Sequence, residues 1–301
     1  LQAVAPNVSP SDLRVMLDEL SAQEGQLTLV SMLRALPQEP LQINLGTLGL
    51  LASQFRLAQM ESEALSRVLE TELQVDAPSL GVIHAEDPFS QGSAAVERWE
   101  LVLRDRARER SIPVDIYWSE ETHGPLVVIS HGFGADRRFF AYLAQHLASH
   151  GLTVVSVEHP GSNVAALMSL PTQTEEIDKP PSRILPATEF LDRPRDISFV
   201  LDRMEKLNYY SYSLRDRMNT DQVTLIGHSL GGNTALALAG AELDLRPLSR
   251  FCQQLSPVNF SPADWLQCAA LDFPVCRADL KDDLVSQWIV INPLRGMLFV
   301  Q

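Results

Sequence analysis

A serine flanked by glycines is the feature of this sequence with the clearest chemical potential. The residues Gly-His-Ser-Leu-Gly run from Gly227 to Gly231, with Ser229 at their centre. An apolar β-branched run at 223–226 precedes them, and a small-residue helical pattern at 234–239 follows. This order predicts a strand, a sharp turn and a helix, with the serine at the apex. The glycines leave room for close chain passage, and a serine raised above a sheet can act as a nucleophile in acyl transfer.

A second glycine-containing turn could supply electrostatic help to that serine. It follows the apolar run 126–130 and contains Gly132 and Phe133. We expect the backbone amides of Phe133 and Leu230 to stabilise the oxyanion of a tetrahedral intermediate, assisted by the positive end of the helix that begins near Leu230. The neighbouring His131 could be a catalyst, but an imidazole at this place is expected to hold the loop by hydrogen bonds.

The elements around these two turns predict how the chemistry is positioned. Alternating strand and helix patterns indicate a mostly parallel sheet with right-handed connections. Two strand-like stretches separated by charged residues indicate an antiparallel hairpin at the sheet edge. The expected strands are 96–104, 111–118, 126–130, 152–157, 223–226 and a buried strand at 285–291, and the expected helices include 139–150 and 192–207.

Two insertions are expected above the strand ends. Residues 160–190 contain too many prolines for a regular element, and residues 243–283 carry several aromatic side chains and all the cysteines. Long loops at this edge of a sheet usually shape a pocket, so both could form a cap with an apolar acyl or alcohol site. A satellite core beneath a loop is an equal alternative for 243–283.

The N-terminal quarter has a different pattern. Residues 1–75 show several apolar stripes at helical spacing, which predicts a small helical domain that docks on the rest or covers its entrance. The segment 45–51 could alternatively line a route for a hydrophobic substrate. Turn-forming residues at 76–95 indicate a linker, and the catalytic core is expected at 96–301.

The amino-acid composition disfavours some classes of partner. The 301 residues are 45% hydrophobic, and 24 Lys plus Arg against 38 Asp plus Glu leave a formal charge of −14. This balance disfavours nucleic acid and anionic membranes as partners. No apolar stretch approaches the roughly 20 residues that span a bilayer. Because the sequence begins at Leu1, we expect any initiator methionine or targeting segment to have been removed.

The cysteines leave two states open. Cys252, Cys268 and Cys276 lie close together without a Cys-x-x-Cys spacing, which argues against a zinc site. They predict either one disulfide and one free thiol or three reduced thiols. Their clustering slightly favours a disulfide and an exported or periplasmic protein over a cytoplasmic one.

Four stretches together resemble α/β-hydrolases of the dienelactone-hydrolase-like and platelet-activating-factor-acetylhydrolase-like kind. They are residues 130–134, 147–151, 157–159 and 227–232, in the same order and at similar spacing. The resemblance implies an α/β-hydrolase fold over residues 96–301, Ser229 as nucleophile, Phe133 and Leu230 as oxyanion amides, and neither a metal nor an organic cofactor. The N-terminal region resembles the extra helical domain of some bacterial, especially cyanobacterial, hydrolases.

The resemblance does not extend to the other two catalytic residues that the family combines with its serine. The family requires an acid and then a histidine after the serine, but all seven histidines precede Ser229. Asn292 stands where the acid is expected, and a neutral amide cannot replace a carboxylate beside an imidazolium. The histidines are His84, His123, His131, His146, His150, His159 and His228, and the nearby acids Asp279, Asp282 and Asp283 precede the last strand.

The fold is therefore expected to lack its C-terminal strands within this sequence. A strand at 285–291 would expose an apolar edge, which natural proteins cover. We expect a further C-terminal segment or a separate fragment to cover it and to supply the acid and the histidine.

Two functions fit these observations. The first is a serine esterase or lipase-like enzyme that cleaves a carboxylic ester with a hydrophobic part, through an acyl-enzyme at Ser229. The second is a catalytically inactive hydrolase fold that serves as a binding module. The complete serine turn together with the glycines of the second turn favours the enzyme, because an inactive scaffold has no obvious use for them.

Overall fold

The computed structural model describes residues 90–120, 122, 124–169, 185–254, 262–273, 277–294 and 299. Before residue 90 it describes Arg56, Met60 and Arg67, all helical. The chain divides into two compact units, Leu1–Ile83 and His84–Gln301, and the elements below belong to the second. The other residues of the predicted N-terminal helices, and the segment 170–184 of the first insertion, lie outside the described residues.

A six-stranded sheet forms the centre of the second unit. Its strand order is β1-β2-β4-β3-β5-β8. β1 pairs antiparallel with β2, and β2 with β4, whereas the pairs β3–β4, β3–β5 and β5–β8 are parallel. The predicted mostly parallel sheet with an antiparallel hairpin at one edge is thus confirmed. The strands are β1 Glu97–Asp105, β2 Arg110–Trp118, β3 Pro125–Ser130, β4 Thr153–Val157, β5 Asn219–His228 and β8 Val285–Ile291.

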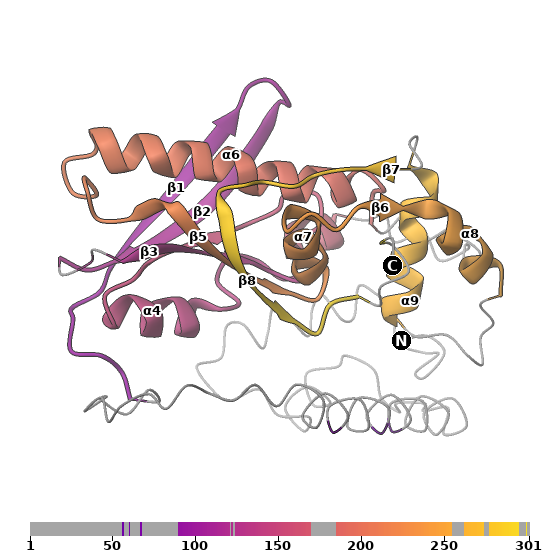
Figure 1. Ribbon diagram of the computed structural model, residues 1–301, viewed down its shortest axis with the longest axis horizontal. Helices are drawn as coiled ribbons and strands as arrows, with labels where there is room; N and C mark the ends of the chain where they lie inside the picture. The colour runs from indigo at the N-terminus through magenta and orange to yellow at the C-terminus, as the bar shows by residue number, and fades with distance from the viewer. Residues whose placement is uncertain are drawn as a thin grey trace, which may run out of the picture. The chain divides into compact units, whose positions relative to one another are not determined.

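Helices cover both faces of this sheet. Alternate residues of β3 face opposite layers: Leu126 and Val128 pack with α6 and α7, whereas Val127 and Ile129 pack with α4. Figure 1 shows α4 on one side of the strands and α6 on the other. Burial on both faces explains why this strand is a continuous apolar run. The helices are α4 Ala141–Ser149, α5 Val164–Met168, α6 Glu189–Tyr210 and α7 Leu230–Leu238.

The described part of the second insertion is a small satellite layer. It contains the short strands β6 Leu243–Asp244 and β7 Arg277–Ala278, the helices α8 Leu245–Gln254 and α9 Pro262–Cys268, and a 3₁₀ turn at Ala269–Asp272. Its apolar residues share a buried cluster with Leu230 and Ala237 of α7. Two cavities in this cluster hold about 10 Å³ each, enough for about one water molecule. Among the described residues, these apolar side chains pack together as a satellite core.

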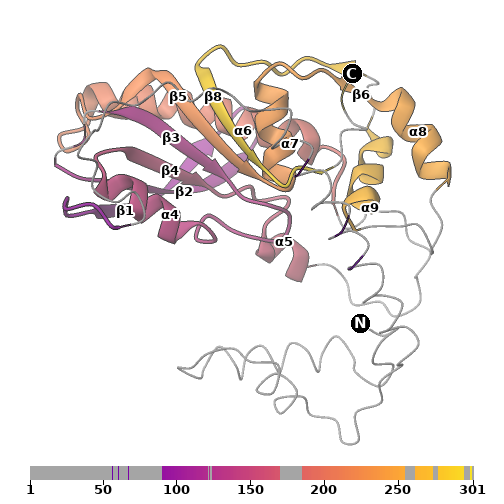
Figure 2. The same ribbon diagram turned by 60° about the horizontal axis from the view of Figure 1, so that its bottom comes forward.

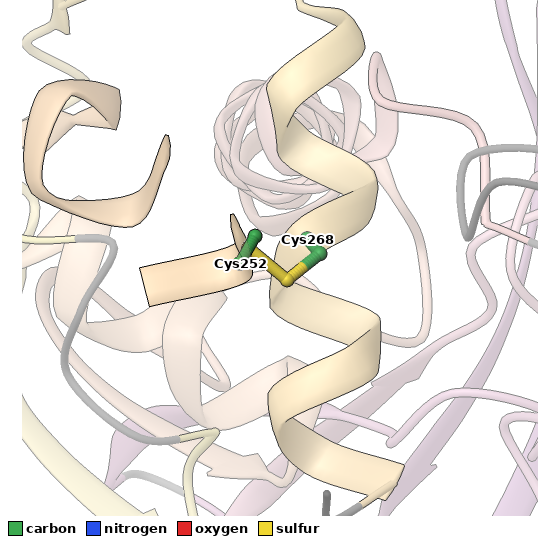
Figure 3. Close-up of a disulfide and its surroundings, with 2 residues drawn as sticks. All are labelled: Cys252 and Cys268. Atoms are coloured by element: carbon green, nitrogen blue, oxygen red, sulfur yellow. A yellow bond between two sulfur atoms is a disulfide. The ribbon is translucent and has the colours of Figure 1, made fainter. Parts of the chain in front are cut away.

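A disulfide joins two helices of this layer. Cys252 in α8 bonds to Cys268 in α9, with an S–S distance of 1.97 Å and a Cα–Cα distance of 5.8 Å (Figure 3). The expected single bridge is therefore present, and Cys276 lies outside the described residues. In the described part of the chain, no helix is long and apolar enough to cross a membrane, and no cluster of side chains suits a metal ion.

Three local expectations were wrong. The proline-rich stretch 160–190 contains the short helix α5, which Asn163 caps by accepting a hydrogen bond from the amide of Ala166 at 2.8 Å. Helix α6 begins at Glu189 rather than 192, because the Glu189 carboxylate is held in its first turn by Arg110 and Ser162. Strand β8 was expected to be buried, but as the edge strand of the described sheet it is exposed at positions 286–289.

Candidate active site

Ser229 occupies the turn between β5 and α7 in a backbone conformation that side-chain-bearing residues rarely adopt. Its φ is 53° and its ψ is −118°. Its amide donates to the carbonyl of Ile291 at 2.9 Å, and its own carbonyl accepts from the amide of Gly232 at 2.8 Å. Because the flanking strand and helix impose this strained turn, the partly exposed serine stays at its apex. The predicted strand, turn and helix are confirmed.

The glycines on either side of the serine are required by close chain passage. A Cβ added at Gly227 would lie 2.1 Å from the carbonyl oxygen of Gly231, and one added at Gly231 would lie 2.1 Å from the carbonyl oxygen of Ser130. Both distances are far below van der Waals contact. A side chain at Gly227 would push away the start of α7, and one at Gly231 would push that helix start away from the end of β3.

The turn at residues 131–134, here called the oxyanion turn, lies directly beside the serine. A Cβ built on Gly132 would be 3.2 Å from the Cβ of Ser229. Phe133 follows in the same turn, and Leu230 is the first residue of α7, where an amide has no partner within the helix. In the described part of the chain neither of these two amides enters a hydrogen bond. Amides without a partner beside a serine are what binding of an oxyanion requires.

The histidine next to the serine is engaged elsewhere. The ring of His228 stacks on Phe139 at a centroid distance of 5.8 Å and meets Phe140 edge to face at 5.5 Å. Its Nδ1 has no hydrogen-bond partner, and no hydrogen bond joins the ring to Ser229 within the described residues. Burial lowers the pKa of His228. The geometry does not make this residue the base for Ser229.

The position expected for the acid does lie beside the serine. Asn292 directly follows Ile291, whose carbonyl accepts the Ser229 amide, and it has a φ of 43°. The carboxylates before β8 are used in turns instead. Asp282 accepts hydrogen bonds from the Ser198 hydroxyl at 2.6 Å and from the Leu284 amide at 3.1 Å. These acids are therefore at the end of the strand opposite the serine, as expected.

A family model described as alpha/beta hydrolase fold matches residues 125–246, which include the serine turn and the oxyanion turn. The sheet order and the turn geometry agree with that match. The described part of the second unit therefore has an α/β-hydrolase fold.

Curated relatives of this chain are named as hydrolases of two kinds. Platelet-activating factor acetylhydrolase of Canis lupus familiaris is 31% identical over 141 residues, which cover 37% of this chain and 31% of the relative. Cutinase cut1 of Thermobifida fusca is 26% identical over 199 residues, covering 61% of this chain and 52% of the relative. Cutinase 2 of Thermobifida cellulosilytica is 30% identical over 133 residues, covering 44% and 40%. The chain thus spans about a third to a half of the length of these relatives.

Exposed apolar side chains flank the oxyanion turn. Helix α5 is tied to the turn because the Gly134 amide donates to the carbonyl of Ser162 at 2.9 Å, and the Val164 amide donates to the carbonyl of Ala135 at 3.1 Å. Figure 2 shows α5 at the carboxyl ends of the strands, where α/β folds bind ligands. The exposed residues on α5, on the segment leading into α4 and in the first turn of α4 are Phe139, Tyr142, Val164, Leu167 and Met168.

Beneath the oxyanion turn lies a buried group of polar side chains that the sequence patterns did not predict. Ser130, His159 and Asp196 are each 0% exposed. The Oγ of Ser130 lies 3.0 Å from Nε2 of His159, and Nδ1 of His159 lies 3.0 Å from Oδ2 of Asp196. These distances are those of a hydrolytic Ser-His-Asp triad. We call these three residues, together with His131 and Arg193, the buried polar network.

Arg193 of α6 is the centre of the buried polar network. It is 0% exposed and donates to Ser162 Oγ at 2.7 Å, to Thr234 Oγ1 and Ser130 Oγ at 3.2 Å each, and to the carbonyl of His131. Burial lowers the pKa of Arg193 to about 10, although the nearby carboxylates of α6 oppose that shift. The guanidinium is therefore charged at neutral pH.

The two histidines of the network are neutral. Nε2 of His131 accepts the backbone amide of His159 at 3.0 Å, so its Nδ1 carries the proton and donates to the carbonyl of Gly132 at 2.6 Å. Burial and the neighbouring Arg193 hold the pKa of His131 and of His159 well below the ordinary value. His131 therefore holds the loop, as expected, and contacts no reacting group.

Sequence signals for this network exist but are indirect. Arg193 and Asp196 each stand four residues before an inward apolar residue of α6, Ile197 and Val200. Polar residues at inward helical positions indicate buried hydrogen-bonding partners. The partners themselves come from β3, from the end of β4 and from α7, and no local pattern specifies them.

Proposed function

We propose that this protein is a serine hydrolase that cleaves a carboxylic ester with a hydrophobic part through an acyl-enzyme at Ser229. The observation that carries the proposal is the strained, partly exposed Ser229 beside the free amides of Phe133 and Leu230. Such a combination stabilises charge that appears only in the tetrahedral intermediate. The names of the curated relatives, acetylhydrolase and cutinase, support hydrolysis of this kind.

The proposed reaction has two halves. The Ser229 oxygen attacks the carbonyl carbon while a base takes its proton, and the two amides bind the oxyanion. The intermediate collapses, the alcohol leaves with that proton, and the acyl group stays on the serine. A water molecule, deprotonated by the same base, then attacks the acyl-enzyme. The base returns that proton to the Ser229 oxygen as the bond to the acyl group breaks and the acid is released. The chemistry uses no metal or organic cofactor.

We propose that the base and its acid partner come from a segment outside the described residues. No described histidine is hydrogen-bonded to Ser229, and Asn292 stands at the position expected for the acid. The exposed residues 286–289 of β8 offer an edge on which further strands could pair. A C-terminal segment or a companion fragment on this edge would bring its own acid and histidine close to the serine. Intact-mass measurement of the natural protein tests this: a mass of 33.4 kDa with no companion fragment would contradict it.

The substrate class follows from charge and exposure. The formal charge of −14 disfavours strongly anionic substrates. The exposed apolar side chains on both sides of the oxyanion turn suit the hydrocarbon part of an ester. A series of nitrophenyl esters of increasing acyl length measures this preference. Equal or falling kcat/KM with chain length would contradict the hydrophobic part of the proposal.

Covalent labelling decides between this enzyme and an inactive binding module. The module is favoured by one observation, the amide of Asn292 in place of a carboxylate. A fluorophosphonate probe should label the protein as it occurs naturally, and peptide mapping should place the label on Ser229. A Ser229→Ala variant is the control and should remain unlabelled. Equal labelling of both proteins, or labelling of neither, would favour the module.

A further inference from the structure

We infer that Arg193 is a positioning residue, which fixes the oxyanion turn from beneath so that the Phe133 amide faces Ser229. This inference rests on the proposed function, because it assigns a role in the same reaction. Arg193 contacts neither Ser229 nor any position a substrate could reach. Its effect passes through the hydrogen bonds of the buried polar network.

The guanidinium joins three elements that meet at the site. Four of its five donor positions are used: the acceptors belong to the end of β3 and the oxyanion turn, to the loop after β4, and to α7. Thr234 lies on the helix that begins directly after Ser229, and Ser162 accepts the amide of Gly134 through its carbonyl. One rigid, planar group thereby sets the spacing between the serine helix and the turn opposite it.

His131 connects Arg193 to the peptide group that carries the Phe133 amide. Arg193 donates to the carbonyl of His131, and the imidazole of the same residue donates to the carbonyl of Gly132 and accepts from the amide of His159. The peptide groups on both sides of Gly132 are therefore fixed. Rotation of the Gly132–Phe133 peptide, which would turn the Phe133 amide away from the serine, requires the bond to the Gly132 carbonyl to break.

Stability alone gives a weak reason for such an arrangement. Burying a guanidinium is costly, and apolar residues of similar volume often serve stability as well or better. Here the charge is balanced by Glu189 and Asp196, which Arg110 also contacts at 2.7 and 2.9 Å. The buried guanidinium therefore fixes the orientation of the peptide groups in the oxyanion turn and adds no apolar burial. A preorganised oxyanion site needs such fixed orientation.

The triad-like distances within the network do not make Ser130 a second nucleophile. Its hydroxyl is 0% exposed, so no ester can reach it. It also accepts a hydrogen bond from the Arg193 guanidinium at 3.2 Å. A cationic donor on that oxygen reduces its nucleophilicity. Ser130, His159 and Asp196 therefore serve to orient Arg193 and the end of β4.

The first experimental arm measures the turn without any catalysis. Arg193→Lys keeps a positive charge but replaces the planar fork by a single nitrogen, which cannot reach three elements. Amide hydrogen exchange should then accelerate at least tenfold in peptides covering residues 130–135 and at His159, relative to the exchange of β2. Arg217→Lys is the matched control, because Arg217 donates to the backbone carbonyls of Ser119 and Glu120, outside the network.

A second variant keeps the test decisive if Arg193→Lys fails to fold. His131→Asn keeps a donor near the position of Nδ1 but offers no acceptor to the amide of His159. It should accelerate exchange at the same peptides, while β2 remains as protected as in the unaltered protein. Unchanged local exchange in both His131→Asn and folded Arg193→Lys would overturn the inference.

The second arm measures chemistry at Ser229 in the protein as it occurs naturally. Fluorophosphonate labelling and ester turnover, normalised to folded protein, should fall roughly 100-fold in Arg193→Lys, mainly in kcat, and should stay within about twofold in Arg217→Lys. An undiminished rate in Arg193→Lys would overturn the positioning role. If the unaltered protein itself is not labelled, the proposed function fails, whereas the exchange arm still decides whether Arg193 holds the turn.

Discussion

Two serines of this molecule lie at the ends of neighbouring strands but differ in their exposure and in their hydrogen-bond partners. Ser229 follows β5, is partly exposed and strained, and lies beside the oxyanion turn, but no described histidine is hydrogen-bonded to it. Ser130 ends β3, has His159 and Asp196 at hydrogen-bond distances of 3.0 Å, and is completely buried. Their strands pair in parallel, with Ser130 opposite Gly227.

The comparison shows which features make a serine reactive. Hydrogen-bond distances among a serine, a histidine and a carboxylate describe how a base could be oriented. They supply neither access for a substrate nor donors for an oxyanion, which is commonly the largest electrostatic contribution to acyl transfer. Ser229 is partly exposed and lies beside the oxyanion turn, but no described histidine is hydrogen-bonded to it. Ser130 has His159 at hydrogen-bond distance but is completely buried. The two sites can be separated by experiment.

Replacement of the exposed serine should have the largest effect. Ser229→Ala removes the atom that forms the acyl-enzyme, so turnover in the natural protein should fall by roughly four orders of magnitude or more. The free energy of unfolding should change little, because the hydroxyl is partly exposed and makes no hydrogen bond within the described residues. Steady-state ester hydrolysis and chemical denaturation measure the two effects. Activity within tenfold of the unaltered protein would remove Ser229 from the mechanism.

The buried site should respond most strongly to pH. The pKa values of His131 and His159 are held well below 6.5 by burial and by Arg193, and for His159 also by Arg110 and Arg108. Below pH 6.5 the unfolded chain therefore binds protons that the folded protein does not. Stability is fully present above that value and should fall by up to about 1.4 kcal/mol per pH unit for each histidine as the pH drops.

Denaturant unfolding between pH 7.5 and 5 tests this expectation. Asp196 acts in the opposite direction at lower pH, because burial raises its pKa above 3.8. A His159→Asn variant removes one titrating group and should reduce the slope by about 1.4 kcal/mol per pH unit. An unchanged slope would mean that His159 is protonated in the folded protein.

The exposed site was largely predictable from sequence, whereas the buried one was not. The serine turn and the oxyanion turn are local, because strand, glycine and helix signals occur within a dozen residues. The buried polar network joins Ser130 to Arg193 across 63 positions and depends on side-chain directions in the folded state. Polar residues on the inward face of α6 hinted at buried partners but could not identify them.

The errors in the fold have similar causes. Residues 285–291 are apolar enough for a buried strand. Its exposure depends on which strands pair with it, and the sequence of the strand does not specify them. Pro-rich composition argued against a helix in 160–190, yet Asn163 is a sufficient cap for the short α5. The exposure of β8 depends on its place at the edge of the sheet, and α5 depends on its Asn163 cap. Neither outcome follows from the average propensity of the residues in the segment.

The strain at the exposed serine should be measurable as stability. Glycine adopts a φ of 53° with a ψ of −118° far more readily than serine does. Ser229→Gly should therefore raise the free energy of unfolding by about 1 kcal/mol relative to Ser229→Ala, which keeps the Cβ and hence the strain. Both variants lack the hydroxyl, so the difference reports the backbone alone. A glycine variant less stable than the alanine variant would mean that the turn is not strained.

Replacement of the buried serine should have the smallest effect and is the sharpest test of the comparison. Ser130→Ala removes the hydroxyl that links His159 to Arg193, but Arg193 keeps its bonds to the His131 carbonyl and to Ser162. The loss of one hydrogen bond within the network is worth about 1 kcal/mol, so we expect about a fivefold decrease both in turnover and in the rate of fluorophosphonate labelling, with the label still on Ser229. If Ser130 were instead the nucleophile, this variant would lose all activity and Ser229→Ala would not. The pair of alanine variants, measured on the same ester, therefore assigns the acyl-enzyme to one serine.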